Sequence, residues 1–132
     1  IDGFVKARTD NFNYLTEKLQ ALSKFLVLPK STKLSTPSWF GYPLTIKKNA
    51  GVSRLMLLKH LDHYKIGTRL LFAGNLTRQP YFQGREYRII GNLENTDIVM
   101  NQTFWIGLYP GLSLEQLDFV VLKMEEFFGI GW

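Results

Sequence analysis

Hydrophobic positions at the start of the chain repeat at helical spacing. Every third or fourth residue is apolar, in the series Phe12, Leu15, Leu19, Leu22 and Leu26. Because such residues share one face of a helix, the pattern predicts a helix over residues 9–28. Thr9 or Asp10 would cap its start, and Pro29 would follow its end.

The strongest helical pattern lies near the C-terminus. Ser113 and Gln116 have the spacing of a capping box, which predicts a helix that begins directly after Ser113. Gly129 is placed to end it, because glycine accepts the left-handed conformation found after many helices. The wide apolar face of this helix would consist of Leu117, Val120, Val121, Met124, Phe127 and Phe128.

Three segments rich in β-branched and aromatic residues predict strands at 38–47, 66–73 and 103–108. Pro43 lies inside the first, so we expect that strand at a sheet edge or a bulge, since proline donates no ladder hydrogen bond. Between the first two strands, residues 52–64 predict a second helix. Its apolar stripe would consist of Leu55, Leu58 and Leu61.

A long irregular stretch separates the last two predicted strands. Residues 74–91 contain three Arg, two Tyr and one Phe without clear periodicity, and a loop of this length in a small domain is usually functional. Residues 95–100 predict a brief helical turn. The order of elements predicts an α+β fold, a small sheet of about three to four strands covered by helices.

The composition indicates one globular domain over residues 1–132. With 45% hydrophobic and 14% aromatic residues, the chain is too apolar for a disordered segment. The absence of cysteine excludes a disulfide scaffold or a Cys-ligated cluster within these residues. No apolar run reaches the roughly 20 residues that span a bilayer. The start at Ile1 has no Met and no signal-peptide pattern, which predicts a cut or processed boundary.

Charge is unevenly distributed along the chain. Residues 24–88 contain twelve Lys and Arg against two acids, whereas residues 92–132 contain one Lys and six acids. A basic middle suits a phosphate-bearing partner, either a nucleic acid or a sugar nucleotide. A solvated basic surface without a binding function accounts for the same charges.

The sequence contains no complete catalytic centre. His60 and His63 have a spacing that can bind a metal, but without a third ligand nearby we expect a solvent-facing pair and no metal site. The Gly-rich phosphate loops and the Gly-x-Ser-x-Gly elbow are absent as well. We therefore predict no catalytic residue inside this chain.

Polar and aromatic residues gather at the predicted strand starts and in the irregular stretch. Aromatic rings supply flat pocket walls, and Arg and amide groups bind phosphates or sugar hydroxyls by directional hydrogen bonds. The candidate binding residues are Trp39, Phe40, Arg69, Asn75, Arg78, Gln79, Asn101, Thr103 and Phe104.

The segments that hold these residues carry a family likeness. PSWFGYP at 37–43, IGTRLLFAGNLTRQPYF at 66–82 and MNQTFWIG at 100–107 resemble the C-terminal part of the CDP-4-keto-6-deoxyglucose 3-dehydratases. These enzymes form a branch of the DegT/DnrJ/EryC sugar aminotransferase family. The likeness extends from about the first helix to the end of the chain, and the middle motif is specific to the dehydratase branch.

The resemblance implies the small C-terminal domain of a type I pyridoxal-phosphate (PLP) enzyme. Such enzymes remove the C3 hydroxyl of a CDP-4-keto-6-deoxyhexose for the dideoxysugars of lipopolysaccharide, using PLP or pyridoxamine phosphate (PMP), a 2Fe-2S cluster and an iron-sulfur flavin reductase. The catalytic histidine, the cofactor-binding residues and the cluster cysteines would precede Ile1. This chain would then close the active site and be inactive alone, within a cytoplasmic enzyme that is a homodimer at full length, with no membrane span and no nucleic-acid partner.

The resemblance also implies roles for the candidate residues. Trp39 and Phe40 would lie near the adduct of cofactor and sugar. The sugar or the diphosphate would contact Arg69, Asn75, Arg78 and Gln79. The pocket wall would include Asn101, Thr103 and Phe104. One position departs from the pattern, because Ile98 stands where some members have a basic residue.

Two other functions fit part of the pattern. A sugar-nucleotide aminotransferase shares the fold and would have a lysine in place of the catalytic histidine upstream. A free-standing nucleic-acid-binding module would use the basic middle and the aromatic residues, although the aromatics do not follow the strand pattern of RNA-recognition motifs.

Overall fold

Four antiparallel strands form the centre of the fold. The computed structural model describes residues 1–130 and orders the strands β1-β2-β4-β3. Their bounds are Leu26–Val27 for β1, Gly41–Ile46 for β2, Thr68–Leu70 for β3 and Thr103–Gly107 for β4. The helices are α1 at Asp2–Lys18, α2 at Arg54–His63, α3 at Glu94–Gln102 and α4 at Leu114–Phe128. This architecture confirms the predicted α+β class.

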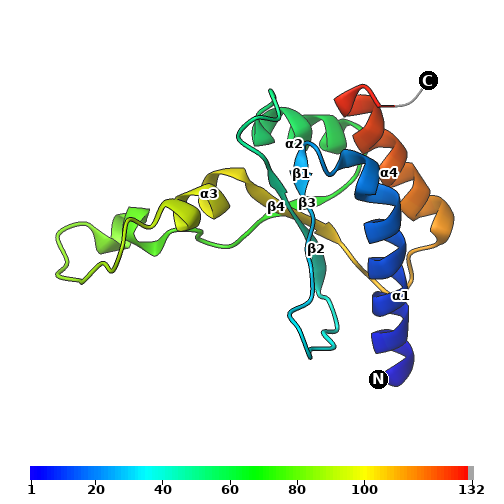
Figure 1. Ribbon diagram of the computed structural model, residues 1–132, viewed down its shortest axis with the longest axis horizontal. Helices are drawn as coiled ribbons and strands as arrows, with labels where there is room; N and C mark the ends of the chain where they lie inside the picture. Colours follow the sequence, from blue (N-terminus) through cyan, green and yellow to red (C-terminus); the bar gives the residue numbers. More distant parts are fainter. Residues whose placement is uncertain (131–132) are drawn as a thin grey trace.

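Helices α1, α2 and α4 supply the apolar side chains that pack on one face of this sheet. Helices α1 and α4 lie side by side, and α2 lies across the end of the sheet (Figure 1). The core between them joins helix residues such as Leu15, Leu57 and Leu117 to Leu44 and Phe104 of the strands, each of them at most 1% exposed. None of the helices in the part of the chain that the structure describes is long and apolar enough to cross a membrane.

The first helix begins earlier and ends earlier than predicted. Helix α1 starts at Asp2, so Thr9 lies inside it and donates its hydroxyl to the Val5 carbonyl instead of capping its start. A 3-10 turn at Leu19–Leu22 follows, and the chain then enters β1 at Leu26. The predicted apolar face is nevertheless buried, because a 3-10 turn also repeats about every three residues. Strand β1 was not predicted.

Pro43 lies in a strand that has neighbours on both sides. Strand β2 pairs with β4 from Gly41 to Thr45, but β1 pairs only with Thr45 and Ile46. Strand β2 is therefore interior in the sheet order, yet at Pro43 it has a neighbour on one side only. The prediction of an edge environment is confirmed for Pro43 itself, because β1 ends before it reaches Pro43. It is wrong for β2 as a whole, which lies between β1 and β4.

Helix α2 differs from its prediction in which residues face the core. Leu61 is buried as predicted, but Leu57 takes the second core position and Leu55 is 62% exposed. His63 is exposed, whereas His60 is half-buried, with its Nε2 atom 2.7 Å from the Lys123 carbonyl oxygen. The expected solvent-facing histidine pair is wrong for His60, because α4 packs over it.

Helix α4 matches its prediction closely. The Ser113 hydroxyl accepts a hydrogen bond from the Gln116 backbone, and the Gln116 side chain accepts one from the Ser113 backbone, which completes the capping box. Gly129 ends the helix with φ +64°, in the left-handed region that glycine tolerates.

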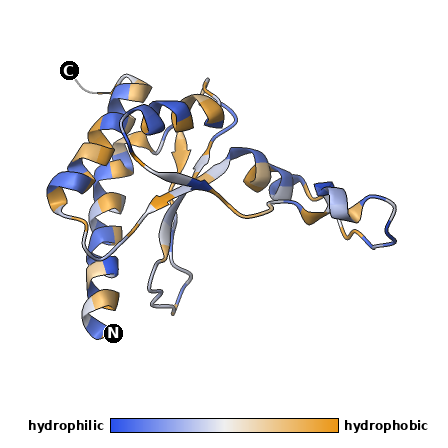
Figure 2. Cartoon of the chain, turned by 180° about the vertical axis from the view of Figure 1, so that it is seen from behind, coloured by the Kyte–Doolittle hydropathy of each residue, from blue (hydrophilic) through white to orange (hydrophobic). Residues whose placement is uncertain are grey.

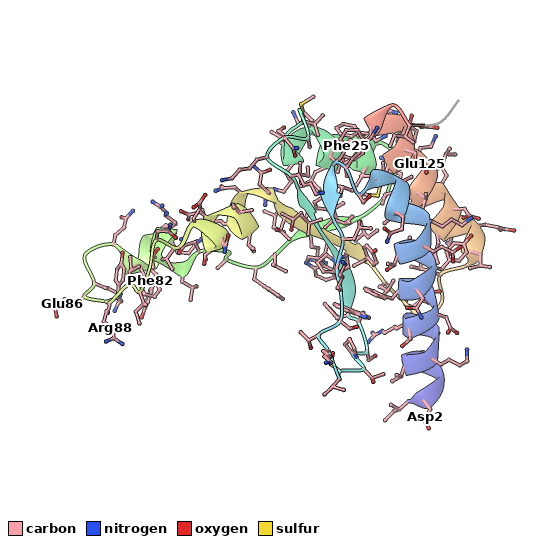
Figure 3. The ribbon with its side chains drawn as sticks, in the orientation of Figure 1. Asp2, Phe25, Phe82, Glu86, Arg88 and Glu125 are labelled. Carbon is pink, nitrogen blue, oxygen red and sulfur yellow. The ribbon has the colours of Figure 1, made fainter. Side chains whose placement is uncertain are left out.

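Residues 74–93 form an arm that extends from the body of the domain (Figure 1). Two 3-10 turns, Leu76–Arg78 and Pro80–Phe82, interrupt its irregular course, and α3 continues from its end. Phe82 lies along the arm, and Glu86 and Arg88 lie near its far end (Figure 3). Hydrophobic and hydrophilic stretches follow one another along the arm (Figure 2), and no layer of helices or strands of the body lies beneath them.

Candidate functional site

The sheet has a second face, opposite the core. Along β2, Tyr42, Leu44 and Ile46 are buried in the core while the alternate residues are not, because successive strand side chains point to opposite faces. Trp105 is paired with Pro43 on one side and with Arg69 on the other. Pro43, Trp105 and Arg69 therefore share the outer face, the sheet surface turned away from the core.

A shallow aromatic groove occupies this outer face. Its volume is about 160 Å³. The residues directly before β2 and directly after β3 complete the groove. Among them, Phe40 is 68% exposed and Phe72 is 85% exposed. The groove is lined by Trp39, Phe40, Gly41, Pro43, Leu71, Phe72 and Trp105.

Close packing against Gly41 holds Trp105 in place. A Cβ atom at Gly41 would lie 2.1 Å from Cε3 of the Trp105 ring, so the ring can rest here only on a residue without a side chain. The indole Nε1 donates to the Leu70 carbonyl at 3.3 Å. The Phe40 ring is tilted against Trp105 with centroids 5.1 Å apart, and Trp39 stacks on Phe12 of α1 at 4.3 Å. The groove therefore has two fixed aromatic rings.

Asp97 of α3 fastens the base of the arm. Arg78 donates to both carboxylate oxygens, from Nε to Oδ1 at 3.2 Å and from Nη2 to Oδ2 at 2.8 Å. The Asn75 amide donates to Oδ1 at 2.7 Å, and its own oxygen accepts from the Thr77 backbone and hydroxyl. We call Asp97, Arg78 and Asn75 the Asp97 clasp. Such bidentate, charge-assisted bonds fix direction as well as distance.

The hydrogen bonds of the clasp keep the Asp97 carboxylate deprotonated. Hydrogen bonds from Arg78, and then from Asn75, hold the pKa of Asp97 below its ordinary value. The same carboxylate raises the pKa of Arg78. Both groups are therefore charged at neutral pH, and the clasp is intact there.

We expect the base of the arm to loosen in acid. Because the folded-state pKa of Asp97 is lowered, its stabilising contribution is complete above the ordinary aspartate pKa of about 3.9 and is lost as the pH falls through the lower folded value. Carbon-13 NMR of the Asp97 carboxyl and hydrogen exchange over residues 74–93 would follow both events. Arg78→Gln should move the Asp97 pKa back towards its ordinary value, and an Asp97 titration that is the same in wild type and Arg78→Gln would contradict the clasp.

The nine predicted binding residues fall into three groups. Trp39 and Phe40 line the aromatic groove, and Arg69 is exposed on the same face beside Trp105. Around the base of the arm, Asn75 and Arg78 bind Asp97, the Gln79 amide donates to the Ala73 carbonyl, and the Asn101 amide donates to the Asp97 carbonyl.

The last two predicted residues are buried. Thr103 is 3% exposed with its hydroxyl 2.7 Å from that of Thr45, and Phe104 is 0% exposed in the core. Neither offers a surface to a ligand in this chain, because β4 turns Phe104 to the core and neighbouring groups cover Thr103.

Sequence reasoning missed Phe72, Leu71 and Asp97. Trp105 was not among the candidate binding residues, although the alternation of a strand places it on the face opposite Phe104 and Ile106. Phe72 gave no signal, because its place in the groove depends on a turn directly after β3. Asp97 gave no signal either, because it is 19 residues from Arg78 along the chain.

A second hollow lies on another side of the molecule. It has a volume of about 510 Å³ and is bordered by Tyr64, Ile66, Tyr109, Leu117 and Val120. It is larger than the aromatic groove, but none of the nine predicted residues lines it. It lies between α4, residues 64–67 and the end of β4, and the outer face remains the better candidate site.

The aromatic groove lacks the side chains that usually hold PLP. PLP enzymes commonly hold the cofactor through a lysine that forms a Schiff base with it and an Asp or Arg partner for the pyridine nitrogen. The groove lining contains neither, the Asp97 carboxylate is occupied by Arg78 and Asn75, and His60 Nε2 is engaged by a carbonyl of α4. Within residues 1–130 no group of three or more His, Cys, Asp or Glu residues could hold a metal ion.

Comparison with known proteins gives consistent matches along the chain. The DegT/DnrJ/EryC1/StrS aminotransferase family matches residues 1–125. A lipopolysaccharide biosynthesis protein of Salmonella typhimurium, RfbH, is 58% identical over 132 residues, which is 100% of this chain and 30% of that protein. The dTDP-4-dehydro-2,6-dideoxy-D-glucose 3-dehydratase of Saccharopolyspora spinosa is 46% identical over 127 residues, 96% of this chain and 27% of that enzyme.

A solved structure confirms the fold. The GDP-4-keto-6-deoxy-D-mannose-3-dehydratase of E. coli with bound hydrated PLP superposes with a TM-score of 0.83 at 24% identity, over 92% of this chain and 31% of that one. The chain thus spans less than a third of the length of these relatives.

Proposed function

The chain belongs to the DegT/DnrJ/EryC1/StrS aminotransferase family, and we propose that it is the C-terminal part of a PLP-dependent deoxysugar dehydratase. The reaction we propose is removal of the C3 hydroxyl from a CDP-4-keto-6-deoxyhexose, in the cytoplasm, for dideoxysugars of lipopolysaccharide. The observation that carries this proposal is the 58% identity to RfbH over all 132 residues. A second relative, whose name is that of a 3-dehydratase, supports the dehydratase branch.

The part played by this chain is to cover the active site. Its core lies on one face of the sheet, while the outer face carries exposed aromatic rings and Arg69, which forms no ion pair with any residue in the range 1–130. Exposed apolar patches rimmed by polar residues mark binding surfaces. We propose that this face and the base of the arm contribute Trp39, Phe40, Arg69, Arg78 and Gln79 to the sugar-nucleotide site.

The cofactors belong to the rest of the protein in this proposal. When bound, PLP or PMP would supply the electron sink for the reaction, and a 2Fe-2S cluster would provide the redox link to an iron-sulfur flavin reductase. Iron-sulfur clusters are held mainly by cysteine thiolates, and the chain has no cysteine. The full-length enzyme would be a homodimer.

Turnover by the complete protein tests the proposal. Incubated with CDP-4-keto-6-deoxyglucose, PMP, the reductase and NADH, the full-length protein should yield the 3-deoxy product by mass spectrometry, whereas the 132-residue chain should yield none and show no visible PLP absorbance when mixed with PLP. An amino-sugar product formed with an amino donor would indicate the aminotransferase instead. Product from the 132-residue chain alone would overturn its assignment as the non-catalytic part.

A further inference from the structure

We propose that the aromatic groove binds the nucleobase of the sugar nucleotide by stacking, with Arg69 at its rim contacting the phosphates. This inference rests on the proposed function and specifies which part of the substrate this chain holds. It differs from the role that family likeness implies for Trp39 and Phe40, namely proximity to the hexose.

The chemistry of the groove lining favours a base over a hexose. A hexose presents hydroxyl groups around its ring, and buried hydroxyls need hydrogen-bond partners. The lining side chains are aromatic and aliphatic, and the one polar group on Trp105, its Nε1–H, already donates to the Leu70 carbonyl. A base can stack by its π-face and leave its polar edge in water, as bases do on aromatic side chains of single-strand-binding proteins.

The size of the groove also limits how much of a sugar nucleotide it can hold. Pockets that enclose a whole drug-sized ligand have volumes of roughly 300–1,000 Å³. At about 160 Å³, the aromatic groove accommodates one ring system and not an entire sugar nucleotide. The remaining parts of the substrate must lie outside it.

The backbone at Phe72 is shaped to present its ring. Phe72 has φ +47°, in the left-handed region that bulky residues rarely adopt, and its side chain is 85% exposed. Its N–H donates to the Leu70 carbonyl at 2.8 Å, the same oxygen that accepts from Trp105. One carbonyl thus ties the turn at Phe72 to the Trp105 ring. Unfavourable backbone conformations of this kind concentrate at ligand-binding positions.

Arg69 supplies the charge that a nucleotide requires. It lies opposite Trp105 and two residues before Leu71 of the groove lining, on the exposed edge strand. Its guanidinium forms no ion pair with any residue in the range 1–130, unlike Arg78, which is held by Asp97. An unengaged guanidinium beside an apolar groove suits phosphate oxygens, which it binds in a bidentate manner.

Binding of CDP, UDP and inorganic pyrophosphate to the chain, followed by NMR, tests the proposal. Stacking should shift the base protons of CDP and UDP upfield and perturb the Trp105 indole N–H signal. CDP and UDP should bind with similar affinity, since the groove forms no hydrogen bonds with the polar edge of the base. Pyrophosphate should bind roughly 5- to 150-fold more weakly, because it has no base to stack. Equal affinity for pyrophosphate, or unshifted base protons, would overturn the stacking proposal.

Substitutions at Phe72 make the test specific. Phe72→Asn removes the ring and keeps a residue that tolerates positive φ, so it should weaken CDP binding by a similar factor, and Phe72→Tyr should restore it. Phe4→Asn, which removes a ring that is 65% exposed on α1, should leave binding unchanged. Unaltered CDP affinity in Phe72→Asn would contradict the proposal.

Full-length enzyme separates this inference from the proposed function. Phe72→Asn should raise KM for the CDP-sugar and leave kcat near its wild-type value. A full-length protein that turns over the CDP-sugar with an unchanged KM in Phe72→Asn refutes the stacking site alone. Base stacking on the chain without any dehydratase turnover refutes the proposed function alone.

Discussion

Phe104→Ala is expected to lower the free energy of unfolding by about 3–5 kcal/mol, the usual cost of removing a phenylalanine from a packed core. Phe104 is 0% exposed and lies opposite Leu44 in the sheet. Burial of this degree makes it a core residue and not the pocket wall that the sequence suggested. Urea denaturation followed by circular dichroism would measure the change.

Phe40→Ala provides the matched control on the outer face. Phe40 is 68% exposed and has one recorded aromatic contact, a tilted one with Trp105, so its loss should cost about 1 kcal/mol or less. A Phe40→Ala variant as unstable as Phe104→Ala would show that the outer face is part of the folding core. That result would remove the distinction between the two faces of the sheet.

Gly74→Ala is expected to detach the arm from α3 and to cost about 1–3 kcal/mol, the range for overpacking a well-packed position. Gly74 has φ +65°, and an added Cβ would lie 2.5 Å from the Met100 Cβ and 2.7 Å from its Cα. Since the backbone of α3 would have to move, the Asp97 clasp should open. Trypsin should then cleave faster after Arg78, Arg85 and Arg88, and urea denaturation would give the energy.

Gly84→Ala isolates the steric part of that effect. Gly84 also has positive φ, at +72°, but an added Cβ would meet nothing within 4 Å. It therefore carries the conformational cost of alanine without the clash against Met100. Equal trypsin sensitivity in the two variants would mean that the contact with α3 does not hold the arm.

The sequence predicted those parts of the fold that depend on local signals. The capping box at Ser113 and the glycine at 129 defined α4 because hydrogen bonds within a few residues set both ends. The start of α1 was wrong, since the added first turns carry largely exposed residues such as Phe4 and have no apolar stripe. Strand β1 is two residues long and exists only through its pairing with β2, a contact that no local pattern shows.

The candidate site was predictable to a similar degree. The prediction for Trp39, Phe40 and Arg69 used polar and aromatic residues at strand starts that a core does not need. The structure places all three on the outer face, and their binding role stays a prediction. Phe104 was misplaced by one position, since the alternation along β4 assigns it to the core and Trp105 to the outer face. The partners of Arg78 and Asn75 could not be anticipated, because Asp97 is 19 and 22 residues away along the chain.

The alternation of Phe104 and Trp105 along β4 restricts how this chain can change in length. An insertion or deletion of one residue in β4 would exchange the two faces, because a one-residue shift turns every strand side chain over. Stability and binding would fail together. The arm has no such periodicity, and surface loops accept added residues at little cost. Divergence in length among relatives should therefore concentrate between Gly84 and Gly91, while β4 keeps a constant number of residues.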